Sequence, residues 1–244
     1  MKLGISSKRA TSKYGVEKGL KLIKQSGFDT VDVSFTSYGK GEENDIYQKS
    51  EDEFLGYFYN FRKRCDELEL EISQTHGRLT TCVPDEGEQA SIKRISELDL
   101  KASQLLGSPV CVFHNAKLKQ FEDVSIEGDF ILEKNKEFFE GFLSPLCEKY
   151  NVKFALETHG RTMVHDKYVL DYLAEASNLL KSFDSIESDY KAICLDTGHC
   201  REANFYGAVT VEEAVKILGK KNRSFFVSPE TIHSLISSKL LFLT

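Results

Sequence analysis

Long apolar segments are missing from this 244-residue sequence: no run approaches the roughly 18 to 20 residues needed to span a bilayer. The first residues, Met1–Ile5, enter a strand-like segment and then a basic stretch. They show neither the apolar core nor the small-residue cleavage site of a signal peptide. We therefore expect a cytoplasmic protein that is not embedded in a membrane.

Paired cysteines are also missing. The six cysteines form no CxxC pair and show no spacing typical of a structural zinc site. We interpret them as reduced thiols. Cys111 and Cys194 fall inside apolar segments and are expected in the core, whereas Cys200 stands next to a candidate site histidine.

A net positive charge and a glycine-rich phosphate loop are also missing. The formal net charge is -6, so long-range electrostatics would repel a phosphate backbone, and nucleic acid is not an expected partner. Ile5–Lys8 follows the first predicted strand without the glycine pattern of a dinucleotide-binding fold.

Apolar strand-like runs alternate with amphipathic helices along the chain, which is typical of βα units that build a parallel sheet. The predicted strands are Lys2–Ser6, Thr30–Phe35, Leu70–His76, Val110–His114, Val152–Thr158 and Ala192–Asp196. The predicted helices include one that starts at a capping box of Ser50 and Glu53, one that ends at Gly107, and two over Leu132–Tyr150 and Lys167–Lys181.

Polar residues stand at the C-terminal end of one predicted strand after another. They are Asp32, Ser34, His76, His114, Glu157, His159, Asp196 and His199. In a barrel all strand ends meet at one mouth, whereas an open sheet brings together only the neighbours of a switch point. The sequence therefore predicts an α/β fold of the (β/α)8 TIM-barrel type.

The end of the chain does not continue this pattern. Six predicted units occupy residues 1–219, and a further βαβ unit needs roughly 30 residues or more, so two complete units do not fit into residues 220–244. We predict a short seventh strand at Arg223–Val227, a helix start at Ser228–Pro229 and an abbreviated eighth strand at Leu240–Leu243. The prediction is one domain whose barrel is incomplete or irregular in its last one to two units, with 220–244 as an atypical tail packed on it.

Glu157 and Asp196 each come directly after an apolar strand. A carboxylate in that position costs several kcal/mol of desolvation unless a cation or hydrogen-bond donors compensate. A divalent metal ion would compensate both. The alternative is that the two acids cap the following helices or pair with Arg161 and Arg201.

The histidines at strand ends favour a function over a structural role. One such histidine usually has a structural role, but His76 and His114 arrive at the same predicted face as the two acids and His199. His165, in a polar loop, and His233, in the tail, lack this context, and we expect no site role for them.

The ordered combination of His, His, Glu and Asp-x-x-His on predicted strands three to six resembles the xylose isomerase-like TIM-barrel superfamily. This superfamily includes sugar phosphate isomerases and epimerases, and endonuclease IV. Leu3–Ser6 and Gly27–Asp32 are similar to its first two strands. The resemblance covers roughly residues 1–219.

The resemblance implies a divalent-metal-dependent isomerase or epimerase of a small sugar, polyol or sugar phosphate that transfers a proton through an enediolate. Glu157 and Asp196 would bind the metal, which could be Mn²⁺, Mg²⁺, Co²⁺ or Zn²⁺, and Glu157 would also be a catalytic base. Substrate would be bound by His76, His114, His159 and His199, with His159 in the pocket wall. In the endonuclease branch His76, His114 and His199 would instead bind metal.

The tail departs from the family, which usually places a histidine on strand seven and a glutamate on strand eight. Asn222–Val227 contains no such histidine, and Glu230 and His233 do not match the missing positions. A non-catalytic, truncated or frame-altered relative with a partial metal or ligand pocket is therefore the alternative. An endonuclease IV-like phosphodiesterase is disfavoured by the acidic charge. The sequence leaves the substrate, the metal and the oligomeric state open.

Overall fold

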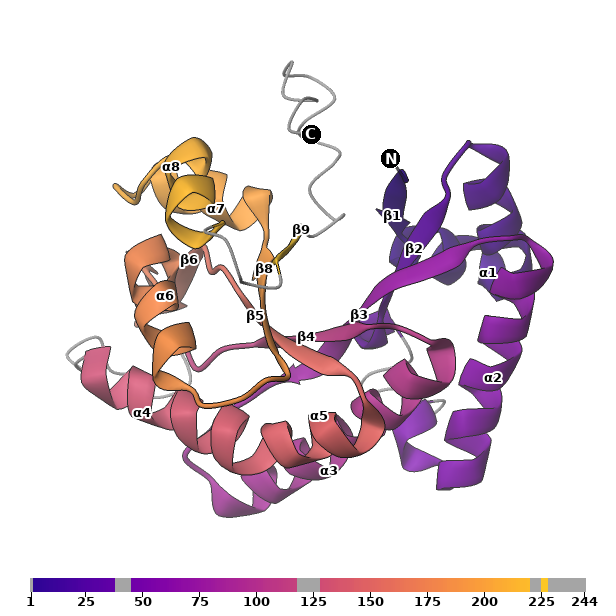
Figure 1. Cartoon of the computed structure of the whole chain (residues 1–244), viewed down its shortest axis with the longest axis horizontal. Helices are drawn as coiled ribbons and strands as arrows, with labels where there is room; N and C mark the ends of the chain where they lie inside the picture. The colour runs from indigo at the N-terminus through magenta and orange to yellow at the C-terminus, as the bar shows by residue number, and fades with distance from the viewer. Residues whose placement is uncertain (1, 38–44, 118–127, 220–224, 228–244) are drawn as a thin grey trace.

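The computed structural model describes residues 2–37, 45–117, 128–219 and 225–227 (Figure 1). Within them, seven parallel strands form one sheet in the order β1-β2-β3-β4-β5-β8-β9. The strands are β1 (Gly4–Ser6), β2 (Thr30–Ser34), β3 (Glu71–Thr80), β4 (Val110–His114), β5 (Lys153–Glu157), β8 (Lys191–Leu195) and β9 (Phe225–Val227). The fold is an α/β barrel that is incomplete within the described residues, which confirms the predicted fold class.

Helices connect the parallel strands and cover the outer side of the curved sheet (Figure 1). They are α1 (Lys8–Gln25), α2 (Glu51–Glu67), α3 (Glu86–Leu106), α4 (Gly128–Phe138), α5 (Ser144–Tyr150), α6 (Ala176–Ser185), α7 (Thr197–Asn204) and α8 (Val211–Leu218). Every helix in the described part of the chain is too short or too polar to cross a lipid bilayer.

Two predicted helix boundaries are confirmed in atomic detail. The Ser50 side chain accepts a hydrogen bond from the Glu53 amide, and the Glu53 carboxylate accepts one from the Ser50 amide, so α2 begins with a complete capping box. Helix α3 ends at Gly107, whose φ of 69° is a left-handed conformation that costs glycine little.

The predicted helix over Leu132–Tyr150 exists, but its course differs from a regular α-helix. It begins earlier, at Gly128, and α4 continues into α5 through a π-helical turn at Phe139–Leu143. The apolar spacing predicts the helix but does not reveal the local change of hydrogen bonding.

The predicted helix over Lys167–Lys181 is wrong in its first half. Strands β6 (Arg161–Val164) and β7 (Lys167–Leu170) form an antiparallel hairpin, and helix α6 starts only at Ala176. The turn residues His165 and Asp166 both have positive φ, 47° and 57°, as a tight two-residue hairpin turn requires. Lys167–Leu170 is therefore extended and pairs with Arg161–Val164 instead of forming the first part of the predicted helix.

The alternation of side chains along the strands places the candidate site inside the barrel. Val110, Val112, Ala155, Ala192 and Cys194 form a small buried cluster separate from the large core between sheet and helices. Because side chains alternate with a period of two, His114, Glu157 and Asp196 continue the rows of this inner cluster at the strand ends.

Two remaining sequence predictions concern the cysteines and the tail. All six cysteines are free and buried, as expected for Cys111 and Cys194. Strand β9 lies within the predicted seventh strand and pairs with β8. The predicted helix at Ser228–Pro229 and the strand at Leu240–Leu243 lie outside the described residues, together with Glu230 and His233. The domain boundary at 219 stays a prediction.

Candidate metal centre

Five of the predicted site residues converge at the C-terminal ends of the parallel strands. His76 lies on β3, His114 and Glu157 end β4 and β5, and Asp196 and His199 lie at the start of α7, directly after β8. They form two groups, His76–His114–Glu157 and Glu157–Asp196–His199, and within each group one ligand atom per residue lies within 4.8 Å of the others. Glu157 is common to both groups.

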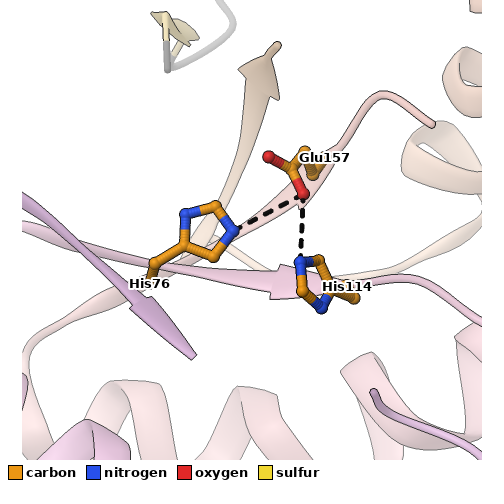
Figure 2. Close-up of side chains that lie close together, drawn as sticks. All are labelled: His76, His114 and Glu157. Carbon is orange, nitrogen blue, oxygen red and sulfur yellow. Dashed lines mark ion pairs between the residues drawn. The ribbon is translucent and has the colours of Figure 1, made fainter. Parts of the chain in front are cut away.

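In the first group both imidazoles face the Glu157 carboxylate (Figure 2). The Nε2 atoms of His76 and His114 lie 3.5 Å and 3.4 Å from Glu157 Oε2. This oxygen is buried, and among the described residues no donor reaches it with hydrogen-bond geometry. A buried carboxylate oxygen in this state is typical of a position where another positive group binds.

In the second group Asp196 has a double role. Its Oδ1 atom accepts hydrogen bonds from the backbone amides of Gly198 (2.7 Å) and His199 (2.9 Å), so it caps α7. Its Oδ2 atom lies 4.0 Å from His199 Nδ1. The alternative that Asp196 caps the following helix is therefore correct. The cap uses Oδ1, and Oδ2 lies on the side of His199.

The orientation of His199 follows from its backbone contact. Its Nδ1 atom lies 2.9 Å from the carbonyl oxygen of Thr158. Because a carbonyl only accepts, Nδ1 carries the hydrogen and the lone pair stands on Nε2, which is how proteins commonly orient a metal-binding imidazole.

Arg161, the predicted arginine partner of Glu157, pairs with other residues. Arg161 donates to Glu202 Oε1 at 2.8 Å and to the Tyr206 hydroxyl at 2.7 Å, and its guanidinium stacks on Tyr168. The side chains that most lower the pKa of Glu157 are His76, His114 and His199.

The electrostatics favour protonation states that bind cations. Burial alone would raise the pKa of Glu157, but His76, His114 and His199 together hold it below its ordinary value. Burial lowers the pKa of His114 to about 3, against the opposing effect of Glu157. An ionised carboxylate therefore faces a neutral imidazole at neutral pH, and both are the forms that a metal ion binds.

His159 belongs to neither ligand group. Its Nδ1 atom is 3.0 Å from Asp171 Oδ1, and its Nε2 atom is 3.5 Å from Asn115 Nδ2. Burial is the main cause that lowers its pKa. Its predicted place in the pocket wall stays a prediction, as do the substrate-binding roles of the other histidines.

Some buried polar residues around the site were not predicted. Asn115 donates from Nδ2 to the Glu157 carbonyl oxygen at 2.6 Å, and Gln74 donates to Asp32 Oδ2 at 2.8 Å. Asn115 directly follows a strand-end histidine, so the same positional rule could have found it. Asp171 follows the hairpin that occupies part of the predicted helix, and no signal in the sequence marks it.

The residues present fit a divalent cation. Donors of one zinc ion, each at about 2.1 Å from it, lie at most about 4.2 Å apart, close to the separations within both groups. Mixed carboxylate and imidazole donors suit Zn²⁺, Co²⁺ or Mn²⁺ and do not select one of them.

Comparisons with solved structures show the same fold in several proteins of low sequence identity. A 3-keto-D-glucoside 4-epimerase, YcjR from E. coli, has a TM-score of 0.68 at 12% identity, covering 97% of this chain and 86% of its own. A D-tagatose 3-epimerase-like protein has a TM-score of 0.61 at 18% identity, covering 99% and 96%. An IolI protein with a bound zinc atom has a TM-score of 0.63 at 17% identity, covering 88% and 68%.

Among curated protein sequences none matches the chain significantly. The family described as a xylose isomerase-like TIM barrel, in contrast, matches residues 20–227. This range includes all five residues of the two ligand groups. The chain therefore belongs to the xylose isomerase-like TIM-barrel family.

Proposed function

We propose that the chain is a divalent-metal-dependent isomerase or epimerase of a small sugar, polyol or sugar phosphate. The observation that carries the proposal is the convergence of Glu157 with Asp196 and His199 on one side and with two histidines on the other. The epimerases among the structures of similar fold support the reaction class.

Glu157, Asp196 and His199 would hold the ion, which when bound would polarise a substrate carbonyl and its neighbouring hydroxyl. Glu157 is the proposed base, because its carboxylate is ionised and Oε2 accepts no hydrogen bond from the described residues. His114 is 27% exposed and neutral, so its ring can donate to or accept from a substrate oxygen.

Metal binding is the first test. The purified protein is freed of metal with a chelator and titrated with Mn²⁺, Co²⁺ or Zn²⁺ in a calorimeter. We expect binding by the wild type and loss of binding in Glu157→Gln and Asp196→Asn. The control is Asp99→Asn. Asp99 is a buried carboxylate that accepts a hydrogen bond from the Tyr47 hydroxyl and belongs to neither ligand group. A wild-type protein that binds none of the three ions would refute the proposal.

Proton transfer is the second test. The metal-loaded protein is incubated in D₂O with a panel of ketoses, aldoses and their phosphates, and deuterium at the carbon next to the carbonyl is followed by NMR. We expect exchange with at least one sugar and none with Glu157→Gln. Metal binding without exchange across the panel would favour the non-catalytic alternative.

A phosphodiesterase is the second candidate, because the His76–His114–Glu157 group offers a place for a further cation and paired ions suit phosphate ester cleavage. It requires two bound ions per chain and cleavage of an abasic-site duplex or a simple phosphodiester. The net charge of -6 does not favour a nucleic acid substrate.

A further inference from the structure

A chain of buried polar groups runs from Asp171 to the backbone of Glu157. Asp171 Oδ1 lies 3.0 Å from His159 Nδ1, and His159 Nε2 lies 3.5 Å from Asn115 Nδ2. Asn115 Nδ2 in turn donates to the Glu157 carbonyl oxygen at 2.6 Å. All four residues are buried.

These contacts determine which nitrogen of His159 carries the hydrogen. A carboxylate only accepts, so the hydrogen of His159 stands on Nδ1 and the lone pair stands on Nε2. Asn115 can then direct one N–H of its amide to that lone pair and the other to the Glu157 carbonyl. If Nε2 carried the hydrogen instead, the His159 Nε2–H and the Asn115 amide N–H would be two donors facing each other.

The Asp171 end of this series of contacts is held by the segment that follows the β6–β7 hairpin. Asp171 Oδ1 also accepts from the Leu173 amide at 3.3 Å and caps the short helix η5 (Tyr172–Ala174). The Asp171 amide donates to the Gly160 carbonyl at 3.4 Å. The residue that sets the His159 tautomer is therefore tied to the backbone three residues beyond Glu157.

We infer that Asp171 is a positioning residue: through His159 and Asn115 it fixes the backbone at Glu157, and with it the carboxylate shared by both ligand groups. The inference rests on the proposed metal function. It assigns no chemical step to Asp171, which contacts neither ligand group directly.

The test compares Asp171→Asn with Asp45→Asn. Both residues are buried aspartates that cap a short 3-10 helix, and asparagine retains a capping oxygen. Because Oδ1 makes both the cap and the contact with His159 Nδ1, the asparagine oxygen keeps the cap but, being neutral, holds the Nδ1 hydrogen less strongly than a carboxylate does. We expect the metal dissociation constant to rise about tenfold in Asp171→Asn, the lower end for groups that orient metal ligands, and to stay unchanged in Asp45→Asn. Equal effects in the two variants would overturn the inference.

A second readout does not depend on metal. The ¹⁵N shifts of the His159 ring, recorded by NMR, report which nitrogen carries the hydrogen. We expect Nδ1–H in the wild type and a larger share of Nε2–H in Asp171→Asn; an Nε2–H tautomer in the wild type would overturn the inference. If the wild type binds no metal, the proposed function fails and the inference falls with it. If the wild type binds metal and Asp171→Asn binds it equally well, only the inference fails.

His159→Gln provides a variant if Asp171→Asn does not fold. Glutamine can present an amide oxygen to Asn115 but makes no imidazole contact with Asp171. We expect its metal affinity to lie between those of the wild type and His159→Leu, which offers Asn115 no acceptor. An affinity in His159→Leu equal to that of the wild type would contradict the positioning role.

Discussion

His114 Nε2 lies 3.4 Å from Glu157 Oε2, and His76 approaches the same oxygen from another strand. Neither distance is that of a short charge-assisted hydrogen bond. The three side chains are thus gathered around one oxygen atom, and the protonation of His114 and Glu157 should govern both metal binding and acid stability.

Acid should destabilise the metal-free protein through His114. Its pKa falls from 6.5 to about 3 on burial. Below about pH 6.5 the unfolded chain therefore binds a proton that the folded chain does not, and the free energy of unfolding falls by up to about 1.4 kcal/mol per pH unit. Glu157, whose pKa is also lowered, adds to this loss below its ordinary value of 4.5.

Urea denaturation with chelator present, between about pH 7 and pH 5, measures this slope. We expect His114→Gln to flatten it, since glutamine does not titrate. A variant with the same slope as the wild type would show that His114 is protonated in the folded protein as readily as in the unfolded one.

Metal removal should lower the thermal stability of the wild type but not that of Glu157→Gln. A ligand at about 100 times its dissociation constant stabilises the folded state by about 2.7 kcal/mol. Thermal unfolding with and without chelator should therefore give two different midpoints for the wild type and a single one for Glu157→Gln. Asp99→Asn should keep the metal-dependent shift even if its own midpoint is lower.

Two glycine-to-alanine changes should have opposite effects on stability. Gly107→Ala places a side chain at a φ of 69° and against the Arg62 guanidinium, so we expect a loss of about 1 to 2 kcal/mol. Gly56 lies within α2 with open space where a Cβ would be, so Gly56→Ala should gain up to about 1 kcal/mol. Chemical denaturation measures both, and effects of the same sign would contradict the helix-end geometry.

The thiols should react slowly in the folded protein. Burial raises the pKa of Cys65 and Cys147 to about 12 and that of Cys82 and Cys200 to about 11. Because the thiolate is the reacting form, a chromogenic disulfide reagent should label all six cysteines in denaturant and none of them rapidly without it. Fast labelling of Cys200, next to His199, would show that the site is open to solvent.

The repeated part of the fold was predictable from sequence because each βα unit carries its own local signals. Val110–His114 was placed to the residue, and the Ser50 capping box marked the start of α2. Strand β3 continues to Thr80, beyond its predicted end at His76, because Thr80 still pairs with His114 of β4 after an irregularity in the register.

The candidate site was predictable to the extent that it depends on strand ends. His114 and Glu157 end their strands, and any parallel barrel brings such positions together. The partners of His159 were not predictable in the same way. Asp171 reaches it only because a hairpin returns the chain to that point, and the turn at His165 and Asp166 contains no glycine or asparagine to mark it.

The β6–β7 hairpin pairs, among the described strands, only with itself. The tip of this hairpin, at His165 and Asp166, can therefore change without shifting the register of the strands that carry the ligand groups, provided that Asp171 keeps its place beside His159. It also begins four residues after Glu157, close to the barrel mouth. Under the proposed function, exchanging this hairpin tip between related chains would be a route to altered substrate preference, because the proposed metal ligands lie on other elements.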